Sequence, residues 1–287
     1  MIHSDQAAGL RAMLNHSPPE VLAVVPCGAA AMHWSARQAR QRAILGQRVL
    51  AFDEWQISGS FSDCLGVSPR FDLLQALEGQ VGVEQCIVDA QPTHSGQMGL
   101  GVLSVSRLAR EIDGDRILQQ RVLSCLLRLQ SSCDEWLLLA RPCDLAGLSS
   151  FARAAPRLLL VVEPVERAIT EAYAALKRLA RGADTLAVGI SVVGDDDAQA
   201  RLLAKRFQRV AASQLGIHVQ AVASVGEAIG LTSGLANGLK NGLTGSESTA
   251  STSADNTPGF PERLLRQARA AISTPSASTG RSRALAW

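Results

Sequence analysis

The residues from Val21 to Trp55 constrain the fold more than any other stretch of the sequence. They consist of an apolar strand, a turn of small residues, a helix closed by a glycine, and a second strand. These are Val21–Val25, Pro26–Ala31, His33–Leu45 with Gly46, and Val49–Phe52. A continuous apolar run is typical of a strand buried on both faces of a sheet, and glycine is common just past a helix end. The stretch predicts the first βαβ unit of a doubly wound fold.

Apolar strands and amphipathic helices continue to alternate along the chain. The further strands expected are Gln85–Val88, Gly101–Leu103, Trp136–Ala140, Leu158–Val162, Leu186–Val193 and His218–Val222. The further helices expected are Phe71–Leu77, Asp115–Leu129, Leu145–Ala154, Glu166–Arg181 and Asp195–Leu215. This alternation predicts an α/β fold, doubly wound, with a mostly parallel sheet and helices on both faces.

The composition divides the 287-residue chain into five segments. Residues 1–15 predict a short N-terminal helix that either docks on the domain or binds a partner, with Asn15–Pro19 as its tether, and residues 20–228 form the α/β domain. Residues 229–258 are rich in Gly, Ser, Thr and Asn and predict a flexible linker. An amphipathic helix is expected at 259–272, and a disordered tail at 273–287.

Charge and cysteine usage narrow the possible environment. The net charge of +2 argues against a general nucleic-acid binder. The six cysteines are scattered without a C-x-x-C pair, and the histidines have no metal-ligand spacing, so neither a disulfide framework nor a metal site is expected. No apolar run reaches the roughly 18 residues that suggest a membrane span. We expect a cytoplasmic protein without a metal.

The turn after the first strand lacks the residues of a phosphate-binding loop. A P-loop uses several glycines, a lysine and a Ser or Thr hydroxyl to hold nucleotide phosphates and Mg²⁺. Pro26–Ala31 contains one glycine, Gly28, and the first lysine of the chain is Lys177. An ordinary tight turn is the interpretation that these residues favour, with Cys27 as a small buried side chain. We therefore expect no ATP or other cofactor at this turn.

The predicted helix at 259–272 has an apolar and a basic side. Its apolar residues include the membrane-contact candidates Phe260, Leu264, Leu265 and Ile272, and its basic residues are Arg263, Arg266 and Arg269. Such a helix can lie weakly on an anionic membrane, dock on the domain, or remain a partly helical tail. The sequence does not choose among these three arrangements.

Two strings resemble the MinD/ParA-type P-loop ATPases, and within them the flagellar-number regulators FlhG and FleN. Asp5–Arg11 (D-Q-A-A-G-L-R) is similar to the D-Q-A-x-x-L-R motif that precedes the ATPase domain of these regulators. Glu163–Lys177 is similar to their strand-end proline and the A-I-T-x-A-Y helix that follows it, and the weaker likeness covers about residues 5–225. In that family the N-terminal motif stimulates the GTPase FlhF, which implies partner-binding roles for the residues Asp5, Gln6, Ala7, Leu10 and Arg11.

The resemblance fails at the residues that handle ATP. The family's K-G-G-x-G-K-T loop falls on Pro26 to Trp34, its D-x-D site retains Asp53 but has Trp55 at the second acid, and its Walker B acid falls on Ala140. Pro26, Cys27, Gly28, Asp53 and Ala140 are therefore expected to form a vestigial nucleotide site without catalytic residues. Since the family's nucleotide-sandwiched dimer needs the missing residues, we expect a monomer.

The resemblance implies a regulator of flagellar number, placement or assembly that acts through protein contacts and not through ATP hydrolysis. Its partners would be an FlhF-like GTPase and proteins of flagellar assembly or transcription control, at the inner membrane or the cell pole. A second hypothesis is a divergent ATPase that uses Asp53, Glu54 and arginines with Mg-ATP. A third is a MinD-like protein that restrains a transcription factor or acts in division or polysaccharide secretion.

Overall fold

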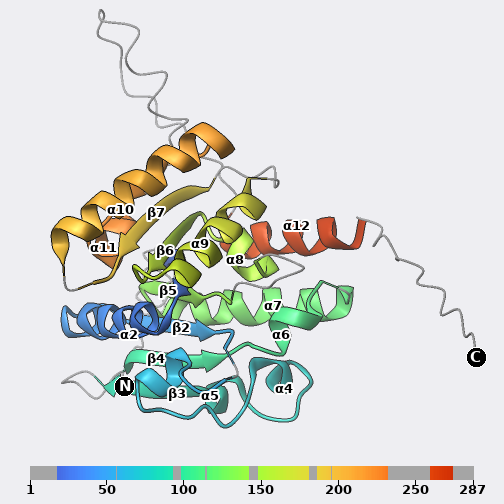
Figure 1. Cartoon of the computed structure of the whole chain (residues 1–287). Helices are drawn as coiled ribbons and strands as arrows, with labels where there is room; N and C mark the ends of the chain where they lie inside the picture. Colours follow the sequence, from blue (N-terminus) through green and yellow to red (C-terminus); the bar gives the residue numbers. More distant parts are fainter. Residues whose placement is uncertain are drawn as a thin grey trace, which may run out of the picture.

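The central sheet runs through the whole domain in the computed structural model (Figure 1). The structure describes residues 18–55, 57–92, 98–113, 115–141, 148–180, 186–194, 196–231 and 259–273, with side chains of the last helix up to Arg266. The predicted N-terminal helix and almost all of the predicted linker lie outside these residues, as does the predicted tail except for its first residue. Among the described helices, none is long and apolar enough to cross a membrane.

Eight strands form one sheet in the order β3-β4-β2-β5-β1-β6-β7-β8. The strands are β1 (Glu20–Cys27), β2 (Val49–Asp53), β3 (Ile87–Pro92), β4 (Met98–Ser104), β5 (Glu135–Leu139), β6 (Arg157–Val162), β7 (Ala187–Val192) and β8 (Val219–Ala221). Among the strands that the structure describes, only β3 runs antiparallel to its neighbour, and the other pairings are parallel. The predicted doubly wound, mostly parallel sheet is confirmed.

Helices cover both faces of this sheet, and each face has its own apolar core. One core contains side chains of α2 (Ala29–Ile44), α3 (Phe61–Cys64) and α11 (Val225–Ile229). The other contains side chains of α4 (Leu73–Leu77), α5 (Val83–Cys86), α6 (Leu108–Glu111), α7 (Arg116–Leu129), α8 (Ser150–Ala154), α9 (Glu166–Leu179), α10 (Asp197–Val210) and α12 (Phe260–Ser273). Short turns η1 (Gln130–Ser132) and η2 (Ala211–Leu215) follow α7 and α10.

Local signals placed several helix ends correctly. Gly46 has φ +90° and follows α2 where the sequence predicts its end, and its N–H donates to the Ala43 carbonyl at 3.0 Å. The Asp115 carboxylate accepts from the Ile117 and Leu118 N–H groups at 2.7 and 3.1 Å and so begins α7.

Several predicted boundaries are wrong: the helix expected from Leu145 begins at Ser150, the helix expected from Phe71 begins at Leu73, and the strand expected from Gly101 begins at Met98. Two further errors change the type of element. Pro26–Ala31 is not a turn, because β1 continues through Cys27 and α2 begins at Ala29. Gln85 and Cys86 belong to the short helix α5, and β3 begins only at Ile87. Both errors arise where small or mixed residues carry no periodicity and the pairing of neighbouring strands decides where an element begins.

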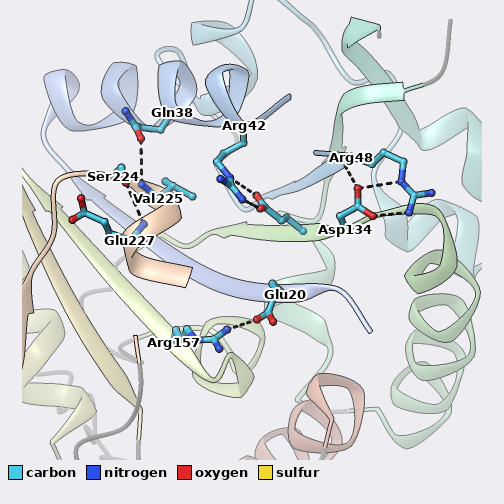
Figure 2. Close-up of polar contacts among 10 residues, drawn as sticks. Glu20, Gln38, Arg42, Arg48, Asp134, Arg157, Ser224, Val225 and Glu227 are labelled. Atoms are coloured by element: carbon cyan, nitrogen blue, oxygen red, sulfur yellow. Dashed lines mark hydrogen bonds and ion pairs between the residues drawn. The ribbon is translucent and has the colours of Figure 1, made fainter. Parts of the chain in front are cut away.

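Ion pairs lie at the end of the sheet where the parallel strands begin (Figure 2). Arg42 of α2 forms a bidentate pair with Glu135, whose side chain is only 3% exposed, and its Nε lies 3.0 Å from Oε2. Arg48 binds Asp134 at 2.6 Å, and Arg157 pairs with Glu20. Gln38 also accepts from the Val225 N–H at 3.2 Å. These contacts hold α2, β1 and β5 in a fixed relation, and thereby the turn between β1 and α2.

Candidate functional site

The predicted vestigial residues meet at one edge of the sheet. Cys27 pairs with Val162 in the register of β1 and β6, and Asp53 pairs with Leu139 in the register of β2 and β5. The carboxyl ends of parallel strands are where doubly wound folds place their ligands. Gly28, Asp53, Ala140 and the residue after Val162, Glu163, therefore lie along a common edge.

The connection between β1 and α2 is a single residue, Gly28. Its backbone has φ +100° and ψ 161°, a conformation that residues with a Cβ rarely adopt. A phosphate-binding loop needs several residues whose N–H groups converge on the anion. One residue is too short for such a loop, in addition to the lack of the lysine and glycines that the sequence shows.

The Glu163 carboxylate lies at the N-terminus of α2. Its Oε2 accepts from the Ala30 N–H at 3.2 Å, and its own N–H donates to the Cys27 carbonyl at 3.1 Å. A Cβ added at Gly28 would overlap this carboxylate and lie 2.8 Å from the Glu163 Cβ. The positive end of a helix dipole with free N–H groups is the usual site for a phosphate, and here the chain supplies its own anion.

Both carboxylate oxygens of Asp53 accept hydrogen bonds from groups of the protein. Oδ1 accepts from the Trp55 N–H at 3.0 Å, while Oδ2 accepts from the N–H and the hydroxyl of Ser62 at 3.0 and 2.6 Å. The side chain is 1% exposed, and burial raises its pKa against the opposing effect of these hydrogen bonds. Asp53 thus fixes the turn after β2.

Glu54 joins the ends of β2 and β5 from inside the protein. Its carboxylate accepts from the Arg141 N–H at 3.1 Å and from the Ser149 hydroxyl. Burial raises its pKa to about 7, the two hydrogen bonds oppose this rise, and the nearby charge of Asp53 adds to it. Sequence reasoning named Glu54 only for the divergent-ATPase hypothesis and gave no sign of this contact with Ser149.

Trp55 and Ala140 stand at the positions where the family resemblance places two acids. The Arg141 guanidinium carbon lies 5.9 Å from the centroid of the Trp55 ring, a cation–π contact. Ala140 is fully buried and its N–H donates to the Val24 carbonyl at 2.8 Å. Within the described ranges, no three His, Cys, Asp or Glu side chains come close enough to hold a metal ion.

The described residues at this edge do not offer a site for ATP and Mg²⁺. The anion position of α2 holds Glu163, the Asp53 and Glu54 oxygens face protein donors, and Ala140 offers no ligand. Cys27 is not a reactive thiol, because burial raises its pKa to about 12, with a further rise from the charge of Glu171. It is a buried side chain in β1, next to Pro26, which pairs with Val161.

A hollow of about 550 Å³ lies further along the same edge, beyond the ends of β7 and β8. Trp34 and Arg37 of α2 line one side, and Arg201 of α10 and Ser191 of β7 line others. It therefore adjoins α2, but Gly28 and Glu163 are not among the residues that line it.

The helix α12 docks on the domain. Phe260 is 6% exposed and meets Trp136 edge-on with ring centroids 5.8 Å apart, and Leu264 is 1% exposed. The Arg263 guanidinium donates to the Ala155 carbonyl at 3.4 Å. Of the three arrangements that the sequence left open, this is docking, and contact of Phe260 and Leu264 with a membrane is incompatible with it. Leu265 is half-buried, and the side chain of Ile272 lies outside the described part.

The proposed partner-binding residues Asp5, Gln6, Ala7, Leu10 and Arg11 lie outside the described residues. Glu163, by contrast, is a site residue to which sequence reasoning assigned no role. The signal available was an acid directly after an apolar strand, but its importance depends on β6 lying beside β1.

No family model matches the chain, and no curated protein matches it. Among solved structures, the chain is similar to the MinD cell division protein of Aquifex aeolicus, with 17% identity, 74% of this chain and 84% of that chain covered, and a TM-score of 0.46. A ParA family ATPase from Chlorobium tepidum is similar with 16% identity, 74% of this chain and 87% of that chain covered, and a TM-score of 0.49. McdA from Cyanothece, in a complex with ATP, is similar with 14% identity, 89% of this chain and 97% of that chain covered, and a TM-score of 0.46.

Proposed function

We propose that the chain is a MinD/ParA-like protein of the FlhG/FleN branch that has kept the fold and lost ATP hydrolysis. It regulates flagellar number, placement or assembly through protein contacts in the cytoplasm, at the inner membrane or the cell pole. Its N-terminal segment Asp5–Leu14 stimulates an FlhF-like GTPase. Proteins of flagellar assembly or transcription control are its further partners.

The Glu163 carboxylate is the observation that carries the loss of ATP hydrolysis. It accepts a hydrogen bond from the Ala30 N–H at the positive end of the α2 dipole, where a phosphate would bind. The turn before α2 consists of Gly28 alone. A phosphate entering there would meet both the side chain and its negative charge. The proposed loss is further supported by Asp53 and Glu54, whose oxygens are already bonded to protein donors.

The partner role rests on the resemblance of Asp5–Arg11 to the activator motif. GTP turnover by FlhF, measured with a peptide of residues 1–20, tests it. We expect the wild-type peptide to raise turnover and peptides with Gln6→Ala or Leu10→Ala to raise it much less. A scrambled peptide of equal composition is the control. The absence of any effect of the wild-type peptide would rule out this partner.

One observation favours a second candidate, a divergent ATPase. The hollow beyond β7 and β8 brings Arg37 and Arg201 to the edge where doubly wound folds bind ligands. Titration with Mg-ATP separates this candidate from the first. A role in transcription control, division or polysaccharide secretion is separated by pull-down from cells, which identifies the partner directly.

A further inference from the structure

A second concave surface lies beside β3 and β4, whereas the hollow described above lies beyond β7 and β8. We call it the edge groove and define it by Val83, Ile87, Met98, Cys125, Leu129 and Ser132. It has a volume of about 470 Å³ and lies between α5, the edge strand β3 with its neighbour β4, and the C-terminal half of α7, all labelled in Figure 1. Five of these six side chains are apolar or thiol, so its floor favours an apolar occupant.

Charged side chains border the floor. Glu84 and Asp89 lie on the α5 and β3 side, and Arg128 lies on the α7 side. Arg128 and Glu84 approach each other to 3.7 Å, but their side chains are 74% and 79% exposed. Such an exposed pair contributes little stability and can exchange one partner for another charge.

We propose that the edge groove holds the segment Asp5–Leu14 of the same chain. The sequence predicts this segment to be a helix with Ala7, Leu10 and Leu14 on one face and Met13 beside them, which matches an apolar floor. Its charge complements one side of the border, since Arg11 flanks this apolar face and can face Glu84 and Asp89. Its length of about 15 Å suits a groove of this size.

The start of β1 puts the segment within reach of the groove. The Glu20 N–H donates to the Asp134 carbonyl at 2.9 Å, and Asp134 is two residues from Ser132 of the groove. Glu20, Glu135, Val49 and Leu100 lie in register across β1, β5, β2 and β4. Three strand spacings amount to about 14 Å, and the tether Asn15–Pro19 spans up to about 17 Å when extended.

The docked state would hide the face of the segment that recognises a partner. This consequence rests on the proposed function, because it assumes that Leu10 contacts the GTPase. The segment would then act only when it leaves the groove, so that the domain controls its own activator. The docking itself does not depend on any GTPase.

Trypsin cleavage after Arg11 tests the docking in the full chain, because Arg11 is the only Lys or Arg among residues 1–36. Leu129→Glu places a charge in the groove floor, and Leu127→Glu on the same helix is its matched control, since Leu127 is 47% exposed and outside the groove. We expect cleavage about tenfold faster in Leu129→Glu and unchanged in Leu127→Glu, since proteolysis follows the population of the open state.

A reciprocal measurement keeps the test valid if Leu129→Glu fails to fold. In the Leu10→Asp chain, hydrogen exchange of residues 83–89 should become faster than in the wild type, with the rest of the sheet unchanged. Equal exchange in both chains, or wild-type cleavage as fast as in Leu129→Glu, would overturn the docking. Protection that rises with protein concentration would instead indicate that a second copy supplies the segment, and would also overturn it. A protected segment whose peptide fails to stimulate FlhF would leave the docking intact and refute only the partner.

Discussion

At the scale of single residues, Glu163 decides what the carboxyl edge of the sheet can bind. Its carboxylate sits at the end of α2 that attracts anions, and it reaches this position because its own backbone is bonded to Cys27. An interaction of a carboxylate with a helix N-terminus is typically worth about 0.3–1 kcal/mol. The residue thus stabilises the helix at the place where it excludes phosphate.

Replacing Glu163 by Gln should therefore lower the free energy of unfolding by about 0.5–1 kcal/mol, because the charge at the helix N-terminus is lost. Urea unfolding followed by circular dichroism measures the change. Glu78→Gln is the control, since Glu78 is an exposed residue at the end of α4. A stability equal to that of the wild type would show that the Glu163 contact with Ala30 is not populated.

Glu54 makes stability depend on pH. In the folded protein its pKa is about 7, against an ordinary value of 4.5, so between these values the folded state holds a proton that the unfolded state has released. Stability from this group is present below pH 4.5 and is lost as pH rises through 7, by about 3 kcal/mol in all. Asp53, whose pKa is also raised by burial, acts in the same direction.

The variant Glu54→Gln removes this titration and keeps an oxygen for the Arg141 N–H. We expect its stability, relative to the wild type, to rise by about 2–3 kcal/mol between pH 5 and pH 8. Urea unfolding at several pH values measures this difference, in which the Asp53 contribution largely cancels. Parallel pH profiles for the two proteins would contradict the assigned burial of Glu54.

At the scale of elements, α2 is held by a buried ion pair at the edge opposite its N-terminus. Glu135 has a side chain that is 3% exposed, and Arg42 is its partner (Figure 2). Removing one member of a buried pair leaves an uncompensated charge, which typically costs 3–5 kcal/mol. The position of α2, and with it the single-residue turn at Gly28, depends on this contact.

Arg42→Ala should thus destabilise the protein by about 3–5 kcal/mol. The matched control is Arg167→Ala, because Arg167 pairs with Glu171 on the surface of α9 and is 91% exposed. That pair should contribute under about 0.5 kcal/mol. Chemical denaturation of both variants measures the contrast, and similar losses in the two would mean that Glu135 is solvated.

Docking of α12 makes a separate prediction. Leu264 is 1% exposed, so Leu264→Ala should cost about 2–4 kcal/mol, while Arg266→Ala at an exposed position of the same helix should cost little. Thermal unfolding compares the two. Equal behaviour of both variants would show that the helix does not stay on the domain.

The sequence predicts most of the strands, but it does not predict which elements contact one another. Apolar runs such as Leu158–Val162 predict their strands because burial on both faces requires them. Glu163 could not be assigned a role, because nothing local says that the end of β6 faces the start of α2. The docking of α12 was open for the same reason, since an amphipathic face does not specify which surface covers it.

At the scale of the whole molecule, the parallel register brings the carboxyl ends of β1, β2, β5 and β6 together. Gly28, Asp53, Ala140 and Glu163 therefore lie along one edge. The sequence predicted three of these positions through the resemblance to a known family, and it predicted that their chemistry is missing. The fold accounts for the rest, because only the strand order places Glu163 beside β1.

Calorimetric titration of the purified chain with Mg-ATP tests the central claim most directly. We predict no heat of binding and no release of phosphate, because the turn at Gly28 has one residue and the Glu163 carboxylate occupies the anion position. Binding in the micromolar range that is abolished by Arg37→Ala or Arg201→Ala would contradict the claim. It would move the nucleotide to the hollow beyond β7 and β8 and restore an enzymatic function.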